Sequence, residues 1–320
     1  MDPNAGKRTL VNKLSREELQ AKLDAESFHR TTVSFYKYVI IENPQALRDE
    51  LFAQWSEWDC LGRIYVSREG INAQMNVPQH HWDAFDVFIH GMEYFHDVPF
   101  KLAVTDKTEG KSFLKLVVKV REQIVADGLQ PEDYDVTDVG AHLTAKDWND
   151  AIEKNDPVVV DMRNHYESEI GHFEGAVLPE AETFREELPM VLEKLKGQED
   201  RKILLYCTGG IRCEKTSAYL KHHGFKDVNQ LHGGIIDYAR QIEEEKLPNK
   251  FHGINFVFDE RLGESISDEI ISECHQCAQP SANHANCANK ACNLLFIQCE
   301  ECAEKHEGCC TPQCIEVIHL

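Results

Sequence analysis

The sequence predicts a protein of mixed α/β and α+β class in three main parts: an N-terminal α+β domain, a central domain on a parallel sheet, and a cysteine-rich tail. Three observations predict this division. Strand and helix patterns first follow the order β-α-β-β-α-β, they then alternate strictly between helix and strand, and nine of the 12 cysteines lie after residue 273. We therefore expect an extension (1–30), the α+β domain (31–126), the central domain (127–250) and the tail (251–320).

Composition and charge limit the classes of function. The formal net charge of −21 argues against broad, nonspecific attraction to nucleic acid or to an anionic membrane, but it does not exclude a local basic patch. No apolar run approaches the length that crosses a bilayer, and the polar N-terminus lacks an apolar signal-peptide core. We expect a soluble cytoplasmic protein without a membrane partner, whose cysteines are metal ligands or catalytic groups rather than disulfides.

The N-terminal domain follows from a regular order of elements. After a helical stretch near 16–26, we expect strand 33–41, helix 44–58, strands 61–66 and 71–77, helix 79–91, and strands 100–104 and 113–120. This order, with one strand added, is typical of a ferredoxin-like (acylphosphatase-like) domain, in which two helices cover one face of an antiparallel sheet.

The central domain begins after a linker at 127–143 that is rich in Asp, Pro and Gly. The expected elements are helix 144–153, strand 157–162, helix 182–195, strand 202–206, helix 212–223 and strand 228–231. Such alternation predicts a parallel sheet with helices on both faces. Ligands bind at the carboxyl ends of the strands in such sheets, and Cys207 lies at one of these ends.

Residues 203–220 give the most specific chemical signal: a strand, a tight loop that begins with Cys207, and a helix. The loop continues with Thr208, Gly209, Gly210, Ile211, Arg212 and Cys213. Converging backbone N–H groups and the positive end of the helix favour a nucleophilic thiolate at Cys207. The alternative, a small buried hydrophobic residue, suits Cys60 better. A Cys207 that titrates like free cysteine, or that is packed in the core away from solvent, would contradict the catalytic interpretation.

The loop is shorter by one residue than that of cysteine phosphatases, in which Arg is sixth after Cys. Arg212 is fifth, so the cradle is too small for a tetrahedral phosphate but could enclose a single sulfur atom. Arg212 is either a solvated loop residue or a source of charge stabilisation at the pocket mouth. Cys213 is either a buried helix residue or a redox or resolving partner, and the sequence leaves both alternatives open.

Three further motifs accompany the loop. They are Val160-Asp161-Met162-Arg163, Gly171-His172-Phe173-Glu174-Gly175-Ala176 and Leu231-His232-Gly233-Gly234, followed by Tyr238 where rhodaneses commonly have Trp. With these motifs, roughly residues 130–250 resemble the rhodanese domain. Rhodanese domains carry sulfur as a persulfide on the loop cysteine, so the resemblance implies this role for Cys207.

The resemblance extends along nearly the whole chain. Ser112-Phe113-Leu114-Lys115-Leu116-Val117-Val118-Lys119-Val120-Arg121 lies between the two domains, and Phe256-Val257-Phe258-Asp259-Glu260-Arg261 precedes the tail. With Cys-Thr-Gly-Gly-Ile-Arg-Cys-Glu-Lys in the loop, this layout resembles the oxygen-dependent tRNA wobble-uridine (position 34) hydroxylases. The resemblance implies an oxidoreductase that converts a tRNA uridine to 5-hydroxyuridine with molecular oxygen as co-substrate.

A tRNA partner would require a local positive surface on this acidic chain, because phosphate contacts dominate affinity. The candidates are Lys111, Lys115, Lys119 and Arg121. Alternation in strand 113–120 places Phe113, Lys115, Val117, Lys119 and Arg121 on one face. The charge pattern alone favours an ordinary half-exposed strand, and the resemblance favours RNA contact. Ferredoxin-like sheets also carry RNA in common modules, although the signature aromatic motif of those modules is absent here.

The tail contains two Cys-x-x-Cys pairs, Cys274/Cys277 and Cys299/Cys302, which have the spacing of zinc knuckles. They predict a structural zinc site, because four thiolates leave no open position for substrate. Other cysteines could complete a second site, and histidines could replace some of them: Cys287, Cys292, Cys309, Cys310, Cys314, His275, His284 and His306. The alternative is a reduced, poorly ordered tail.

The sequence leaves the mechanism open. It has no Gly-x-Gly-x-x-Gly turn for a flavin or nicotinamide, and no spacing that indicates a facial triad for iron. One hypothesis is that the Cys207 thiolate adds to C6 of the flipped-out uracil and makes C5 electron-rich. A persulfide on Cys207 is the rival route. The alternative functions are a rhodanese-type sulfurtransferase and a non-enzymatic, zinc-tailed RNA-binding scaffold.

Overall fold

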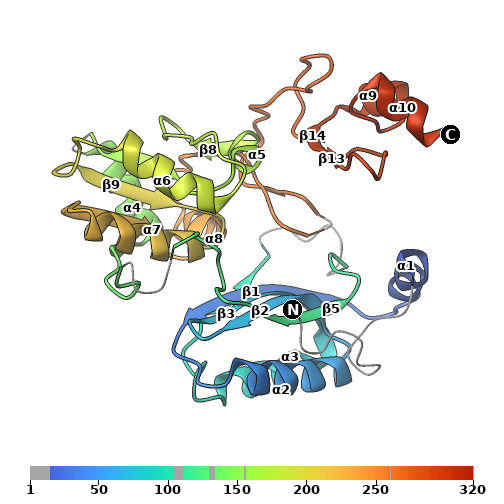
Figure 1. The fold of residues 1–320 in the computed structure, drawn as a ribbon, viewed down its shortest axis with the longest axis horizontal. Helices are drawn as coiled ribbons and strands as arrows, with labels where there is room; N and C mark the ends of the chain where they lie inside the picture. Colours follow the sequence, from blue (N-terminus) through green and yellow to red (C-terminus); the bar gives the residue numbers. More distant parts are fainter. Residues whose placement is uncertain (1–14, 104–110, 130–133, 155, 260, 320) are drawn as a thin grey trace. The chain divides into compact units, whose positions relative to one another are not determined.

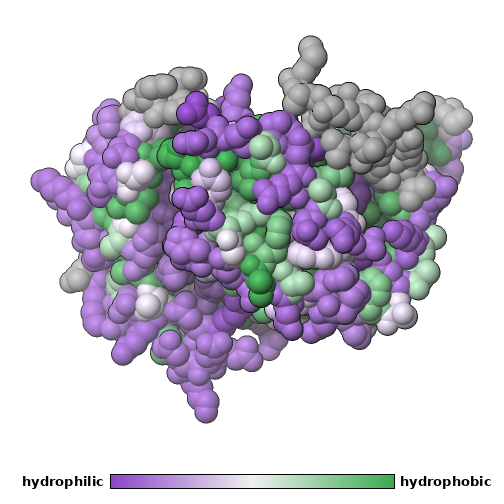
Figure 2. Space-filling model, turned by 90° about the horizontal axis from the view of Figure 1, so that it is seen from below, coloured by the Kyte–Doolittle hydropathy of each residue, from purple (hydrophilic) through white to green (hydrophobic). Residues whose placement is uncertain are grey.

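The structure is a computed structural model that describes residues 15–103, 111–129, 134–154, 156–259 and 261–319 (Figure 1). The chain forms two compact units, residues 1–126 with 258–261 and residues 127–257 with 262–320. Among the described residues, no helix combines the length and apolar character that crossing a membrane requires. Hydrophilic side chains dominate the face drawn in Figure 2, and hydrophobic side chains are interspersed among them.

The first unit contains a five-stranded sheet in the order β4-β1-β3-β2-β5. Its strands are β1 (Arg30–Tyr38), β2 (Leu61–Ser67), β3 (Gly70–Pro78), β4 (Lys101–Leu102) and β5 (Leu116–Val120), and its helices are α1 (Arg16–Asp24), α2 (Pro44–Glu57), the 3-10 turn η1 (Gln79–His81) and α3 (Trp82–His90). This architecture confirms the ferredoxin-like (acylphosphatase-like) prediction. The added strand corrects one detail, because β5 pairs with β2 in parallel rather than antiparallel fashion.

The two ends of the segment between β4 and β5 differ from the predicted strands. Strand β4 has only two residues, and position 104 of the expected strand lies outside the described residues. Strand β5 begins at Leu116 instead of 113, because the Asn76 side chain binds the preceding segment: it accepts hydrogen bonds from the Phe113 backbone N–H (2.9 Å) and the Ser112 hydroxyl (3.2 Å). Phe113 is buried, which corrects the prediction that it shares the solvent-facing side of the basic strand.

Helices α2 and α3 both lie on one face of this sheet (Figure 1). One row of paired residues crosses the sheet and faces the helices, where it joins the buried cluster of Trp55 and Phe85. The row comprises Phe35, Ala73, Ile64 and Val118. The next row points to the opposite, helix-free face and comprises Tyr36, Asn72, Tyr65 and Lys119.

The second unit contains the predicted parallel sheet, in the order β6-β10-β9-β7. Its elements are β6 (Ala141–Leu143), α4 (Ala145–Glu153), β7 (Val158–Asp161), α5 (His165–Ser168), α6 (Phe184–Lys194), β9 (Lys202–Tyr206), α7 (Ile211–His222), β10 (Asp227–Leu231) and α8 (Gly234–Glu245). Strand β6 falls inside the predicted linker, because three residues are too few to produce a pattern. Helix α8 was not predicted, because its N-cap Gly233 and its first residue Gly234, with φ of 70° and 69°, have the sequence pattern of a turn.

Beside the parallel sheet lies a small antiparallel sheet of β8 (Gly171–Phe173), β11 (Phe251–Asn255) and β12 (Glu264–Ser265). Aromatic rings from both sheets and from helices α4 and α8 form one core, which includes Trp148, Phe173, Tyr206, Tyr238 and Phe251. The Tyr238 hydroxyl donates to the Asn149 side chain (2.9 Å) and accepts from the Lys250 backbone (2.8 Å). These partners explain how a tyrosine fits a buried position where rhodaneses commonly have Trp.

The tail contains a hairpin of β13 (His284–Asn286) and β14 (Leu295–Ile297), followed by α9 (Glu300–Lys305) and α10 (Pro312–Ile318). The hydrophobic cluster at its centre consists of Cys287, Phe296, Cys309 and Cys314, with Cys310 and Ile315 packed against it. Cysteine therefore takes the place that aliphatic and aromatic residues hold in the other two cores.

Candidate active site

Cys207 lies between the end of β9 and the start of α7, in a loop whose backbone turns toward its sulfur. Gly210 is the N-cap of α7 and has a φ of 93°, which favours glycine. Its backbone N–H donates a hydrogen bond to the Cys207 Sγ at 3.1 Å. The Gly-Gly pair therefore permits the turn that brings a peptide donor to the sulfur.

The surroundings of Cys207 favour its ionised form. Burial raises the pKa of this thiol, but several contacts outweigh that effect: a hydrogen bond from the Cys213 thiol, the positive charge of Arg212, and the backbone N–H groups of Arg212 and Cys213. Together they lower the pKa of Cys207 to about 5. Cys60 is buried without such donors, and burial is the main reason why its pKa is raised to about 12.

The exposure of Cys207 differs from what the catalytic interpretation required. Its side chain is 0 % exposed, so the thiol is closed off from solvent. Cys207 belongs to the buried core of the protein, but polar groups contact its sulfur. Two conditions would contradict the catalytic interpretation. The first, a thiol packed away from solvent, is met, and the second, an ordinary thiol pKa, is not. A substrate reaches this sulfur only after neighbouring residues move.

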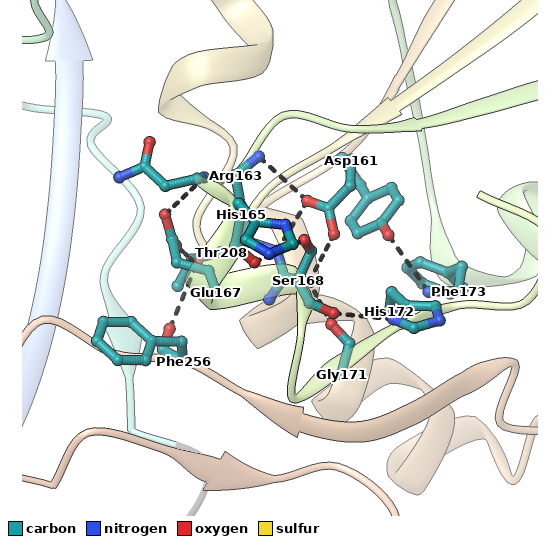
Figure 3. A network of polar contacts seen from close by, with 12 residues as sticks. Asp161, Arg163, His165, Glu167, Ser168, Gly171, His172, Phe173, Thr208 and Phe256 are labelled. Atoms are coloured by element: carbon teal, nitrogen blue, oxygen red, sulfur yellow. Dashed lines mark hydrogen bonds and ion pairs between the residues drawn. The ribbon is translucent and has the colours of Figure 1, made fainter. Parts of the chain in front are cut away.

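Arg212 is buried and engaged in an ion pair, which excludes the solvated alternative. Its guanidinium donates to both carboxylate oxygens of Glu167, at 2.6 Å and 2.9 Å. Glu167 lies on α5 and also accepts a hydrogen bond from the Thr208 hydroxyl at 3.3 Å. The Thr208 hydroxyl lies 3.4 Å from the Phe256 carbonyl as well, and Figure 3 shows Glu167, Thr208 and Phe256 side by side. Helix α5, which was not predicted, thus holds the loop.

Cys213 lies in the first turn of α7, fully buried, and its thiol hydrogen-bonds the Cys207 sulfur. Burial and the neighbouring Cys207 raise the pKa of Cys213 well above its usual value. Cys213 is therefore the protonated donor and Cys207 the acceptor. It is a buried helix residue in contact with the Cys207 sulfur, and a redox or resolving role for Cys213 stays a prediction.

Glu187 is a site residue that the sequence analysis missed. It lies on α6, is fully buried, and has no hydrogen-bond partner for either carboxyl oxygen among the described residues. Burial raises its pKa well above the usual value; the charge of Arg212 opposes this effect, and those of Asp161, Glu167 and Cys207 add to it. Glu187 is thus a neutral acid within electrostatic reach of Cys207. A signal was available, because Phe184, Leu188 and Val191 form the buried face on which Glu187 falls.

The Asp161/Arg163 motif has a structural role beside the loop. The two side chains form a fully buried ion pair of 2.6 Å at the end of β7, and the Arg163 guanidinium also donates to the Gly171 carbonyl at 2.5 Å. Figure 3 shows this pair next to His172 and Phe173 on β8. The motif therefore joins the parallel sheet to the small antiparallel sheet.

The four predicted RNA-binding residues lie along β5 and its flanks. Lys115 and Arg121 are exposed, while Lys111 and Lys119 are half-buried. Strand β5 is an edge of the sheet, and Lys119 pairs with Tyr65 on the helix-free face. The Arg121 guanidinium lies over the Tyr65 ring, 5.6 Å from its centroid. Aromatic and basic side chains thus meet on this face.

The tail brings its cysteines together in two groups. The thiols of Cys274, Cys277, Cys299 and Cys302 lie within 4.8 Å of one another, and so do those of Cys287, Cys292, Cys310 and Cys314. Cys309 belongs to neither group. The three candidate histidines, His275, His284 and His306, also lie outside both groups. His275 instead contacts Glu169 (2.7 Å), and His284 packs against Phe256.

Comparisons with known proteins find matches along most of the chain. Three family models match it, described as UPF0176 acylphosphatase like domain (residues 30–124), Rhodanese-like domain (144–241) and Rhodanase C-terminal (252–315). A curated relative named tRNA uridine(34) hydroxylase, from Leptospira interrogans, is 56% identical over 98% of this chain and 85% of its own. A relative of the same name from Yersinia enterocolitica is 51% identical over 97% of this chain and 89% of its own.

Proposed function

The chain belongs to the tRNA uridine(34) hydroxylase family, and from this premise we propose that it hydroxylates C5 of the uridine at tRNA position 34, giving 5-hydroxyuridine with molecular oxygen as oxidant. The observation that carries the proposal is the Cys207 thiolate, which has a pKa of about 5 and lies at the carboxyl end of a parallel strand. With tRNA as substrate, the proposed compartment is the cytoplasm.

In the proposed route, the Cys207 thiolate adds to C6 of the flipped-out uracil, and C5 gains the electron density of an enolate. C5 then attacks an oxygen donor at the oxidation level of a peroxide, which forms from oxygen, two electrons and two protons. The O–O bond breaks and releases water. Loss of the C5 proton and of the C6–S bond restores the thiolate. The two electrons come from an external reductant of the dithiol class.

Two residues support Cys207 in this route. The neutral carboxyl of Glu187 donates a proton to the uracil oxygen that gains charge when the thiolate adds, which is the task of a buried acid with a raised pKa. The guanidinium of Arg212 is committed to Glu167 by two hydrogen bonds, so it acts as a positioning residue that fixes the loop and favours the thiolate.

The tRNA surface that we propose is the helix-free face of the N-terminal sheet together with Lys111, Lys115, Lys119 and Arg121. Two features support it. The row Tyr36, Asn72, Tyr65 and Lys119 offers aromatic rings on which unpaired anticodon-loop bases can stack. The cations along the edge strand β5 supply phosphate contacts that the acidic remainder of the chain lacks.

We also propose that Cys274, Cys277, Cys299 and Cys302 hold one structural zinc ion. The residue type and the close approach of the four thiols suit zinc, which prefers four thiolates in tetrahedral sites. A complete thiolate shell excludes substrate from the metal, so the proposed chemistry stays at Cys207.

Nucleoside mass spectrometry on position 34 tests the proposal. The full chain, tRNA and a dithiol are incubated in air and under nitrogen, with Cys207→Ala and the matched control Cys60→Ala. We expect one added oxygen in air only, lost in Cys207→Ala and retained in Cys60→Ala. Hydroxylation by Cys207→Ala would overturn the assignment of Cys207 as the nucleophile. Thiocyanate formed from thiosulfate and cyanide, without change in the tRNA, would instead support sulfur transfer; tRNA binding with neither product would support the scaffold.

The covalent step has its own test. With tRNA that carries 5-fluorouridine at position 34, the C5 substituent cannot leave as a proton, and the Cys207–C6 bond should persist as a protein–tRNA adduct in denaturing gels. Failure of Cys207→Ala to form the adduct is the control. Active wild-type protein that forms no adduct would favour the persulfide route.

A further inference from the structure

We propose that the tail is a binuclear zinc module in which two four-thiolate sites are interleaved along the chain. The additional site consists of Cys287, Cys292, Cys310 and Cys314, whose thiols lie within 4.8 Å of one another. This inference concerns metal binding and fold, so it does not depend on the hydroxylase activity. It extends the assignment of one zinc ion to the Cys274 group.

The distances between sulfur atoms fit tetrahedral zinc. A Zn–S bond of ~2.3 Å gives sulfur–sulfur edges of about 3.8 Å in a tetrahedron. The observed separations are 3.6 Å between Cys277 and Cys299 and 3.7 Å between Cys292 and Cys310. Cys310 and Cys314 are 3.9 Å apart. A disulfide requires about 2.05 Å, so these sulfur atoms have the spacing of metal ligands.

The order of the ligands along the chain defines the interleaving. The first and third cysteine pairs, Cys274/Cys277 and Cys299/Cys302, form one group, while the second and fourth, Cys287/Cys292 and Cys310/Cys314, form the other. The hairpin of β13 and β14 explains this order. The second pair follows β13, and β14 returns the chain to complete the first site. Neither site can form from a continuous half of the tail.

Two side-chain amides connect the sites, that of the half-buried Gln276 and that of the buried Gln298. Gln276 lies between the cysteines of the first pair, and its side-chain N–H₂ donates to the carbonyls of Cys309 (3.0 Å) and Cys310 (3.2 Å). Gln298, next to Cys299, donates to the Gln276 side chain at 2.8 Å. At the second site, the Cys310 backbone N–H donates to the Cys287 sulfur at 3.5 Å. Loss of one ion should therefore weaken the other site.

The tail needs the metal because its own hydrophobic cluster is small. Three of the four buried residues in that cluster are cysteines, and two of them, Cys287 and Cys314, belong to the second site. Removing the ion would leave buried thiols in place of a core. Binding energy at such sites is folding energy, which is why small zinc modules unfold without metal.

The module also contacts the candidate active site. His275, inside the first Cys-x-x-Cys pair, forms an ion pair of 2.7 Å with Glu169, which caps the C-terminus of α5. That helix carries Glu167, the partner of Arg212. In addition, His284 on β13 packs edge-on against Phe256, with ring centroids 5.3 Å apart. The tail thus contacts α5 and Phe256, while the groups that hydrogen-bond the Cys207 sulfur belong to the loop itself.

Metal analysis of the full chain tests the proposal. Native mass spectrometry should find two zinc ions per chain in the wild type and fewer in Cys310→Ala. The neighbouring Cys309→Ala is the matched control and should retain both, because Cys309 lies outside the two groups. One zinc ion in the wild type would overturn the second site and leave the first; none would overturn both. None of these outcomes depends on hydroxylase activity.

Two measurements keep the test decisive if Cys310→Ala fails to fold. Cys310→His supplies an alternative zinc ligand and should retain two ions with weaker binding of one. Correlated NMR of the cadmium-substituted protein should connect one metal to Cys274, Cys277, Cys299 and Cys302, and the other to the remaining four ligands. Metals that connect instead to Cys274, Cys277, Cys287 and Cys292, and to Cys299, Cys302, Cys310 and Cys314, would overturn the interleaving.

Discussion

The loop and the tail stabilise sulfur in two different ways. In the loop, the chain itself provides the donors: Gly210 and Cys213 hydrogen-bond the sulfur of Cys207, and Arg212 adds charge. In the tail, eight thiols form two groups of four, and the sulfur atoms of each group lie within 4.8 Å of one another. Each group has the arrangement of a cation site. Peptide donors leave a thiolate free to form a bond with carbon, whereas a metal occupies it. The difference teaches that cysteine grouping, more than cysteine burial, separates the chemical from the structural role.

Removal of metal gives the largest expected effect and tests this comparison directly. A chelator should unfold the tail, because zinc binding to thiolate sites contributes about 10–16 kcal/mol per site. The pKa of Cys207 should stay at about 5, since its donors belong to the chain. Circular dichroism follows the first change, and the ultraviolet absorbance of thiolate in a pH titration follows the second. A Cys207 pKa that returned to its ordinary value would mean that the two regions are not independent.

Glu167→Ala should produce the next largest effect. Both members of the Glu167/Arg212 pair are buried, so the variant removes the carboxylate that accepts two hydrogen bonds from the Arg212 guanidinium and should lose about 3–5 kcal/mol of unfolding free energy. Asp150→Ala is the control: it breaks an exposed pair with Lys154 and should cost less than about 1 kcal/mol. Urea denaturation measures both. Equal losses would show that the loop does not depend on its ion pair.

Glu187→Gln separates the chemical role from the fold. The amide keeps the size of a neutral acid but gives up the proton less readily, so hydroxylation should fall about 10²-fold. Because burial raises the pKa of Glu187, the stability that its neutral form contributes is full below the unfolded pKa and lost as the pH rises through the folded one. The variant should therefore be at least as stable at neutral pH. A less stable, fully active variant would contradict both parts.

Cys207 has the opposite dependence on pH. Its folded pKa of about 5 lies below the ordinary 9.0, so the contribution of its thiolate to stability is full above pH 9 and is lost as the pH falls toward 5. Stability relative to Cys207→Ala should rise with pH in this window by at most about 1.4 kcal/mol per unit. Cys213→Ala removes one hydrogen-bond donor and should raise the Cys207 pKa. The pH range over which the thiolate changes the stability should then become narrower. An unchanged titration would exclude Cys213 as a donor.

The sequence allowed the fold to be predicted further than the site. Periodicity and the Gly-Gly turn were enough to place Cys207 at the end of β9, because a strand, a loop and a helix each leave a local pattern. The burial of Glu187 had a local signal in the apolar face of Phe184, Leu188 and Val191, but its place near Cys207 depends on long-range packing of α6. Spacing singled out the two Cys-x-x-Cys pairs of the Cys274 group, but it did not separate Cys309 from the ligands of the second group. The interleaving is a property of the hairpin.

The smallest expected effect lies outside the two sulfur regions. Arg121→Ala and Lys115→Ala remove exposed cations from the edge of the N-terminal sheet, so each should weaken tRNA binding and reduce the slope of log affinity against log salt by about 1. Lys154→Ala removes an exposed cation at the C-cap of α4 and should leave the slope unchanged. Single-turnover hydroxylation at saturating tRNA should not change, because the role proposed for these side chains is phosphate contact and not bond formation. Variants that alter the rate at saturation and keep the salt slope would place their role in the chemical step, and the division between sulfur chemistry and charge recognition would have to be redrawn.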